Sequence, residues 1–339
     1  MKRWQAALVV CAGLIGHAVS AQPAPAAPAM SAGAATMSLD QWLMRLHSAS
    51  QGRAYSGTFV VTTGQFMSSS RIWHVCDGQQ QIERVDALTG EPRTTYRRND
   101  QVLTFWHGNH VALMERRESL GLFPELLRQA DSSLAQFYRL SPIGQERVAG
   151  VLADKAQLTP LDAWRFGFRI WTERSTGLVV KLQTLDANQA VLEQAAFSEL
   201  QLNAPVEMAR LSAQMANTHG YAVRQAAWVK TTAQQEGWQV KPMVAGFKPV
   251  SCNRRAANSL PGGNSQTLQC VYSDGLATLS LFIEPFEATR HPIAQTSTPL
   301  AMGATHVLMR QLGNWWLTAV GEVPVQTLQA FAQGLERTP

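Results

Sequence analysis

The sequence contains few residues whose type and spacing suggest catalysis or metal binding. His107 and His110 come closest to the spacing of metal ligands, but they lie in a predicted hairpin turn without an obvious third ligand. Glu115 and Glu118 could form a carboxylate pair, yet two arginines lie between them, as on a solvated charged face. Serine-hydrolase, phosphate-loop and zinc-protease motifs are absent. We therefore expect a binding protein with no catalytic residue, metal or cofactor, and keep an exported hydrolase with an unrecognised site as an alternative.

The cysteines predict one disulfide and one free thiol. Cys11 lies in the apolar N-terminal run, so three cysteines remain in the chain that follows it. Cys252 and Cys270 flank one loop, and we predict that they form a disulfide in an oxidising compartment. Cys76 lies in a strand-like run beside His74 and is predicted to be a half-buried thiol, since a nucleophile needs an activating base and a positive pocket.

The N-terminus predicts export. Lys2 and Arg3 precede an apolar run that ends in Val19-Ser20-Ala21, so residues 1–21 have the pattern of a cleaved signal peptide. The run is too short to span a bilayer, which takes about 20 residues. Residues 22–37 are small, uncharged and rich in proline, and are predicted to be a disordered leader. The chain is therefore expected to be a soluble, exported protein.

The charge pattern argues against nucleic acid as a partner. The formal net charge is +5, and removing Lys2 and Arg3 with the signal peptide leaves +3. The basic residues form separate pairs and not one stripe, whereas nucleic-acid binding requires a continuous basic surface.

The body of the chain begins with a helix and continues mainly as strands. Ser38 and Gln41 form a capping box, and apolar residues at helical spacing follow to about Ser50. Period-two patterns with turn residues between them predict an antiparallel sheet that curls into a barrel or half-barrel. The predicted strands cover residues 56–63, 71–76, 80–87, 94–98, 102–106, 146–151, 161–172, 179–184 and 191–202, with a helical stretch at 123–138.

The predicted strand at 161–172 has a wide apolar face. Arg165 and Arg169 alternate with four apolar residues and should point to the opposite side of the sheet. The apolar residues are Trp164, Phe166, Phe168 and Ile170. From these residues alone, a core covered by helices is favoured over a cleft that holds a ligand.

A second, smaller unit follows a predicted linker at 206–235. Residues 266–272 and 276–284 form a predicted hairpin, in which Asp274-Gly275 suits a type I′ turn. A second hairpin covers 305–320, and Pro324 suits the first turn of a C-terminal helix. Residues 236–339 are thus predicted to be an α+β module, and the whole chain to be mainly β.

Three short motifs give the chain a specific resemblance. Gly246-Phe247, Tyr272-Ser-Asp-Gly-Leu276 and Gly321-Glu-Val-Pro324 occur in an order and spacing that resemble the RseB/MucB family. These proteins are periplasmic negative regulators of the sigma-E (AlgU-type) envelope-stress response. The resemblance extends from about Ser38 to the C-terminus.

The resemblance implies both a fold and a function. It implies a LolA-like unclosed barrel over 38–205, whose apolar hollow is partly covered by helices. The domain at 236–339, together with the larger one, would hold the periplasmic segment of a transmembrane anti-sigma factor (RseA/MucA-like) and shield it from proteolysis. A lipid, lipopolysaccharide or lipoprotein acyl chain would relieve this hold. The resemblance therefore favours the cleft over the core, with Leu126, Leu127 and Phe137 in the covering helices beside the four apolar residues of 161–172.

Partner contacts are expected on the smaller domain. Its turn-rich sheet edges could accept an added strand, with exposed polar residues around Tyr272 and Asp274 and charge complementarity from Arg254 and Arg255. The alternative function is a periplasmic lipid or lipoprotein carrier, which would need no second domain. The sequence leaves the oligomeric state open, a homodimer included.

Overall fold

The computed structural model describes residues 37–116, 123, 132–225, 228–241, 244–255, 267–291 and 299–338. The predicted signal peptide, residues 22–36 of the predicted leader, and both Leu126 and Leu127 lie outside these ranges. No helix within them is both long and apolar enough to cross a membrane.

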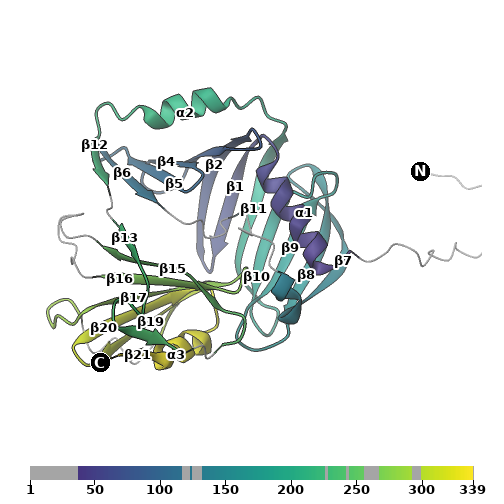
Figure 1. Ribbon diagram of the computed structural model, residues 1–339. Helices are drawn as coiled ribbons and strands as arrows, with labels where there is room; N and C mark the ends of the chain where they lie inside the picture. The colour runs from purple at the N-terminus through teal and green to yellow at the C-terminus, as the bar shows by residue number, and fades with distance from the viewer. Residues whose placement is uncertain are drawn as a thin grey trace, which may run out of the picture. The chain divides into compact units, whose positions relative to one another are not determined.

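The first helix forms as its capping box predicts. α1 (Leu39–Gln51) begins after Ser38, whose Oγ accepts a hydrogen bond from the Gln41 amide at 3.2 Å, while the Gln41 side chain accepts one from the Ser38 amide at 3.1 Å. The apolar side of α1 is buried in a cluster with strand residues that include Phe168 and Ile170. The helix therefore covers part of one face of the large sheet (Figure 1).

The large sheet has twelve strands and does not close. Its spatial order is β12-β6-β5-β4-β3-β2-β1-β11-β10-β9-β8-β7, and all neighbours are antiparallel except β12 and β6. The strands are β1 (Tyr55–Thr63), β2 (Phe66–Cys76), β3 (Gln81–Ala87), β4 (Arg93–Arg98), β5 (Gln101–Trp106), β6 (Val111–Arg116), β7 (Tyr138–Val148), β8 (Val151–Pro160), β9 (Gly167–Glu173), β10 (Val179–Leu185), β11 (Val191–Leu202) and β12 (Ala222–Gln225). The predicted unclosed antiparallel sheet is confirmed.

Three predicted elements differ from the structure. The strand predicted at 146–151 is wrong, because Ala149 and Gly150 have positive φ and form the turn that joins β7 to β8. The described part of the helical stretch at 123–138 contains only a short 3-10 helix, η1 (Ser132–Gln136), and Tyr138 already begins β7. The strand predicted at 161–172 begins only at Gly167, because Asp162 accepts a hydrogen bond from the Trp164 amide at 3.0 Å and folds the preceding residues into a turn.

The segment 206–235, predicted as a linker, is largely structured. It contains α2 (Met208–Ala216), whose Leu211 and Met215 are buried in a cluster with residues of β2–β6. β12 then adds to the large sheet beside β6. The large sheet therefore includes residues up to Gln225.

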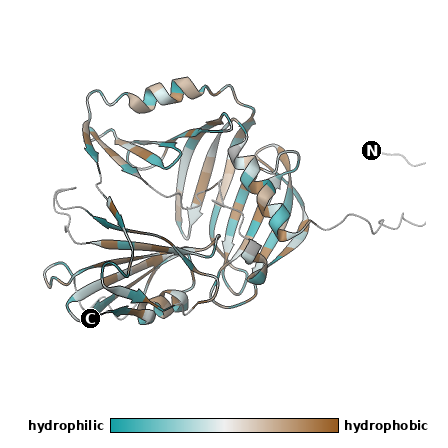
Figure 2. Cartoon of the chain, viewed as in Figure 1, coloured by the Kyte–Doolittle hydropathy of each residue, from teal (hydrophilic) through white to brown (hydrophobic). Residues whose placement is uncertain are grey.

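The second sheet has seven strands and is covered by a helix, so the predicted α+β module is confirmed. Its order is β13-β15-β16-β17-β20-β19-β18, and a short pair, β14 with β21, lies beside it. α3 (Val325–Gly334) buries Leu328 and Phe331 in the core of this unit. Figure 2 shows hydrophobic and hydrophilic residues interleaved along the strands, as half-buried strands require. The strands are β13 (Trp228–Thr231), β14 (Trp238–Val240), β15 (Lys248–Arg255), β16 (Leu268–Ser273), β17 (Thr278–Pro285), β18 (Leu300–Met302), β19 (Thr305–Leu312), β20 (Trp315–Gly321) and β21 (Leu335–Arg337).

The cysteines lie in strands of both sheets. Cys252 and Cys270 are direct partners across β15 and β16, and a disulfide joins them with their Cα atoms 4.1 Å apart. Cys76 is unbonded and half-buried at the end of β2, and burial raises the pKa of its thiol. A raised pKa lowers the thiolate fraction, which makes Cys76 a poor nucleophile.

Candidate functional site

One face of the large sheet encloses a cavity. Its volume is about 460 Å³, within the range that small-molecule sites occupy. Because strand side chains alternate between faces, every second residue of β1–β5 and β9–β11 can point into this space. The cavity is lined by Phe59, Val61, Ile72, Glu83, Val85, Arg93, Thr95, Arg97, Val102, Thr104, Trp106, Phe123, Phe168, Ile170, Leu182, Thr184, Glu193, Ala195, Leu276 and Glu322.

The lining combines an apolar wall with a few charged groups. Valine, leucine, isoleucine and phenylalanine side chains make up about half of it, as suits a hydrocarbon ligand. Arg97 lies 3.7 Å from the Glu83 carboxylate, so this pair partly neutralises its own charge. An apolar chain with a polar end therefore suits the cavity better than a fully polar ligand does.

Two of the described apolar residues predicted for this site line the cavity, and three do not. Phe168 and Ile170 are part of the wall. Trp164 packs on the core of the small sheet, the Phe166 ring lies 5.8 Å from the His306 ring, and Phe137 packs against Arg165. The lining lacks Trp164 and Phe166 because the chain turns at 161–166 and does not continue the strand, and it lacks Phe137, which follows η1 and packs next to that turn.

The C-terminal part of the chain contributes two residues to the cavity. Leu276 comes from the turn between β16 and β17, and Glu322 directly follows β20. Each belongs to one of the motifs that carry the family resemblance. The cavity is therefore completed by residues that are more than 70 positions beyond the last strand of its wall in the sequence.

Glu322 faces a second carboxylate. Desolvation in the hollow and then the negative charge of Glu193 raise the pKa of Glu322 to about 7. Residue 322 is nonetheless exposed to water, which screens both effects. We therefore expect Glu322 to titrate between its ordinary value and 7.

This pair predicts a pH dependence of stability. A raised pKa means that the folded chain binds the Glu322 proton more tightly than the unfolded chain does. The resulting stabilisation of the fold is therefore present below pH 4.5 and is lost as the pH rises toward about 7. Glu322→Gln removes this titration, and its free energy of unfolding should fall less over that interval, by about 1 kcal/mol after screening. Urea unfolding across the interval measures this, with Glu336→Gln, an exposed carboxylate, as the control. Equal slopes for wild type and Glu322→Gln would contradict the assignment.

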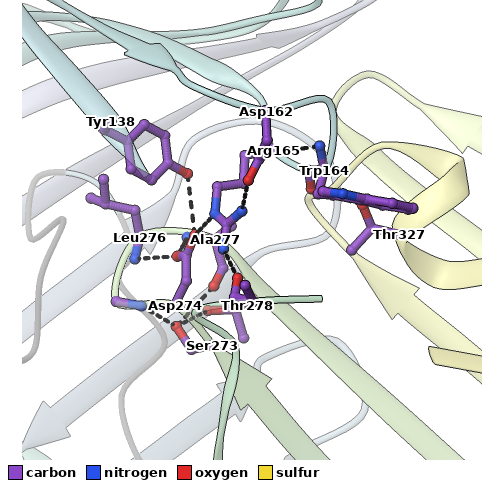
Figure 3. Close-up of polar contacts among 12 residues, drawn as sticks. Tyr138, Asp162, Trp164, Arg165, Ser273, Asp274, Leu276, Ala277, Thr278 and Thr327 are labelled. Carbon is purple, nitrogen blue, oxygen red and sulfur yellow. Dashed lines mark hydrogen bonds and ion pairs between the residues drawn. The ribbon is translucent and has the colours of Figure 1, made fainter. Parts of the chain in front are cut away.

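A buried ion pair links the end of the large sheet to the small sheet. Arg165 Nε donates to Asp274 Oδ2 at 2.6 Å, and neither side chain is exposed to solvent (Figure 3). The guanidinium also pairs with Asp162 and donates to the Ala245 carbonyl. Arg165 thus joins elements that are more than 100 residues apart in the sequence.

Aromatic side chains surround this ion pair. The Arg165 guanidinium lies 4.3 Å from the centre of the Phe137 ring and 5.1 Å from that of Phe247. The Tyr138 hydroxyl donates to Asp274 at 3.4 Å, and burial, followed by the Asp274 charge, raises the pKa of Tyr138 well above its ordinary value. This environment excludes water, so each charge depends on its partners.

Gly246 permits the close approach of these groups. Its φ is +89°, and a Cβ there would lie 2.5 Å from the Phe137 ring and 2.6 Å from the Arg165 guanidinium. Only glycine fits a site with both constraints. Hydrogen bonds from Gln326 to the Ala163 carbonyl and from Thr327 to the Trp164 carbonyl, both 2.7 Å, hold the same turn from α3.

The turn that contains Asp274 differs from the prediction. Asp274 Oδ1 accepts hydrogen bonds from the amides of Leu276 at 2.9 Å and Ala277 at 2.8 Å, so four residues connect β16 to β17. Gly275 has a φ of +107°, but Asp274 has no positive φ, and the two-residue type I′ turn is wrong. Tyr272 and Asp274 are buried, so the exposed polar surface expected there is also wrong. The carboxylate turns inward because it pairs with Arg165.

Arg254 and Arg255 end a strand inside the small sheet. β15 lies between β13 and β16, and so these arginines are not on a free sheet edge. The Arg254 side chain is 51% exposed and lies 3.6 Å from Glu236, whereas the Arg255 guanidinium lies 6.0 Å from the Trp228 ring centre. Arg254 is the more accessible of the two.

Of the two histidines with metal-like spacing, His107 forms hydrogen bonds within the protein. His107 Nε2 lies 3.0 Å from Thr94 Oγ1, and its Nδ1 lies 2.7 Å from the Tyr221 hydroxyl. Within the described ranges, no group of three or more histidine, cysteine, aspartate or glutamate residues is placed to hold a metal ion.

Comparisons with known proteins agree with this architecture. The models of the MucB/RseB N-terminal and C-terminal domains match residues 38–215 and 232–336. The sigma factor AlgU regulatory protein MucB of Pseudomonas aeruginosa is 30% identical over 298 residues, which cover 86% of this chain and 88% of that protein. The sigma-E factor regulatory protein RseB of Salmonella typhimurium is 24% identical over 295 residues, covering 87% and 89%. The crystal structure of MucB in complex with MucA(peri) aligns with a TM-score of 0.62 and 26% identity, over 88% of this chain and 98% of that one.

Proposed function

This chain belongs to the MucB/RseB family, and from that premise we propose that it binds the periplasmic domain of a transmembrane anti-sigma factor and thereby regulates a sigma-E-type response. The observation that carries the proposal is that both family domains are present and that the related MucB forms a complex with MucA(peri). The protein acts in the periplasm after cleavage of its signal peptide, and it shields the anti-sigma factor from proteolysis.

The ligand that enters the cavity is the signal to which this regulator responds. An acyl chain of a lipid, lipopolysaccharide or lipoprotein enters the apolar space, and each buried methylene contributes about 0.8 kcal/mol. A ligand shifts a binding equilibrium only by its difference in affinity for the two states. The cavity is lined by strands of the large sheet and by two residues next to strands of the small sheet, which supports a link between its occupancy and the arrangement of the elements that hold the partner.

Strand addition remains our proposal for the partner contact. Within the described residues, the edge strands of the small sheet are β13 and β18. Of these, β13 lies next to β15, which carries Arg254, and we propose that β13 offers its outer backbone groups to an extended peptide. Of the four residues expected to contact the partner, Arg254 retains an exposed guanidinium that could attract an acidic segment. Tyr272 and Asp274 are buried, so we infer that they support partner binding only by stabilising the fold.

Titration calorimetry tests the proposal. The full chain is titrated with the periplasmic domain of its own anti-sigma factor, with and without a long-chain acyl lipid. We expect a specific complex whose affinity falls at least about tenfold with lipid present, the effect of a coupling of about 1.4 kcal/mol. Lipid binding without any anti-sigma complex would instead identify a carrier, and a complex insensitive to lipid would remove the sensing role. The full chain is needed because a chain ending at Gln225 would leave Arg165 without Asp274.

A further inference from the structure

Five large apolar side chains are exposed where three hairpin ends meet. Phe66 is 72% exposed and Met67 is 67% exposed at the start of β2, and Met302 is 61% exposed at the end of β18. Val191 and Leu300 are exposed beside them. We call these five residues the tip cluster.

The three hairpin ends are in contact. A Cβ at Gly303 would lie 2.3 Å from the Thr63 side chain and 3.0 Å from the Leu192 carbonyl oxygen, so the β18–β19 turn touches the ends of β1 and β11. Thr63 is the direct strand partner of Phe66. Residues from three separate hairpins therefore gather at one place.

These ends contain no charged residue. The segments 62–70, 187–191 and 299–305 consist only of small, polar uncharged and apolar residues. Apolar side chains of this size at an exposed turn have no role in the core, and a cluster of them marks a surface that binds something. A partner recognised through ion pairs would find no counter-charge in these segments.

The tip cluster adjoins the cavity. Val61 and Glu193 line the cavity, and Thr63 donates a hydrogen bond to Glu193 at 3.1 Å. Glu322, also in the lining, follows Gly321, whose strand partner is His306 in the hairpin that carries Met302. One end of the cavity and the tip cluster thus lie next to each other, joined through Thr63 and Glu193.

We propose that the tip cluster docks the protein on a lipid bilayer surface, so that an acyl chain passes from the lipid phase into the adjoining cavity. Side chains on separate hairpin tips do not form a groove for a peptide, whereas the boundary between headgroups and acyl chains deforms around them. This inference rests on the proposed acyl ligand of the cavity. Because the docking contact is apolar, the protein should bind neutral and anionic bilayers alike.

Vesicle flotation with the full chain tests the docking. We expect binding to phosphatidylcholine vesicles and to mixed phosphatidylethanolamine–phosphatidylglycerol vesicles, with little change between about 50 and 500 mM salt, because salt screens charge and not apolar contact. The triple variant Phe66→Ser, Met67→Ser, Met302→Ser should lower vesicle partitioning at least about tenfold. The matched control is Ile143→Ser with Leu152→Ser, two exposed apolar residues on β7 and β8, which should bind as wild type does.

A second measurement separates docking from the function of the cavity. The triple variant should still bind a fluorescent fatty acid at concentrations below micelle formation, and should still bind the anti-sigma periplasmic domain. Absence of vesicle binding by wild type, or equal binding by the triple variant, would overturn the docking proposal while leaving the acyl site intact. Loss of anti-sigma binding in the triple variant would assign the tip cluster to the protein partner and also overturn it. Failure of fatty-acid binding in wild type would remove the proposed ligand itself.

Discussion

Replacing Arg165 with alanine should lower the free energy of unfolding by about 3 to 5 kcal/mol, the cost of breaking a buried ion pair. Asp274 would still accept hydrogen bonds from the amides of Leu276 and Ala277 and from the Tyr138 hydroxyl, but its negative charge would remain buried without a cation. The variant also loses the packing of the guanidinium between Phe137 and Phe247. Urea unfolding measures the change.

Arg254→Ala is the matched control for this prediction. Arg254 forms an exposed pair with Glu236, and such pairs contribute between about 0 and 1 kcal/mol. A double-mutant cycle of Arg165→Met and Asp274→Asn isolates the pairwise contribution, which should be at least about 1 kcal/mol because the two groups are in direct contact. Similar losses in Arg165→Ala and Arg254→Ala, together with additive effects in the cycle, would contradict a buried ion pair.

Replacing Val61 with glutamate should weaken acyl binding at least about tenfold. The side chain lines the cavity, and a carboxylate there must lose hydration when an acyl chain enters, a cost that exceeds 1.4 kcal/mol for an unpaired charge. Val61 is only half-buried, so the chain should still fold. Phe168→Glu is less informative, because Phe168 lies both in the cavity wall and in the core cluster beneath α1.

The adjacent valine supplies the control. Val60 is also half-buried but points to the opposite face of β1, so Val60→Glu should bind a fluorescent fatty acid as wild type does. Anti-sigma binding should persist in both variants, while release by lipid should be lost in Val61→Glu alone. Unchanged acyl affinity in Val61→Glu, with circular dichroism showing a folded protein, would place the ligand outside this cavity.

Local patterns in the sequence were sufficient to predict many of the individual elements. The capping box at Ser38 and Gln41, the period-two runs of β1–β5 and the hairpin of β19 and β20 form as predicted. Each depends on contacts within a few residues, since hydrogen bonds at a helix start and alternation along a strand are local. The short motifs also carried the family, which the two domain matches confirm.

The candidate site could be predicted only in part, because its positions depend on distant contacts. Period two placed Phe168 and Ile170 on the cavity wall, but it also extended the strand over Trp164 and Phe166. Asp162 turns the chain, and Arg165 pairs with the carboxylate of Asp274, 109 residues further along the sequence. These contacts override the period-two pattern. Asp-Gly at 274 suggested an exposed turn, since no local signal shows that a turn residue is buried.

The sequence by itself therefore determined most of the strands, the first and last helices and the family, all of which follow from short-range propensity and motif order. Only the tertiary structure decided that Leu276 and Glu322 complete the cavity, that Asp274 faces Arg165, and that three uncharged hairpin tips come together. The physical reason is that burial and pairing of a side chain depend on which distant segments pack against it. Residue type and spacing limit which side chains can be buried or paired, and the packing of the two sheets determines which of them are.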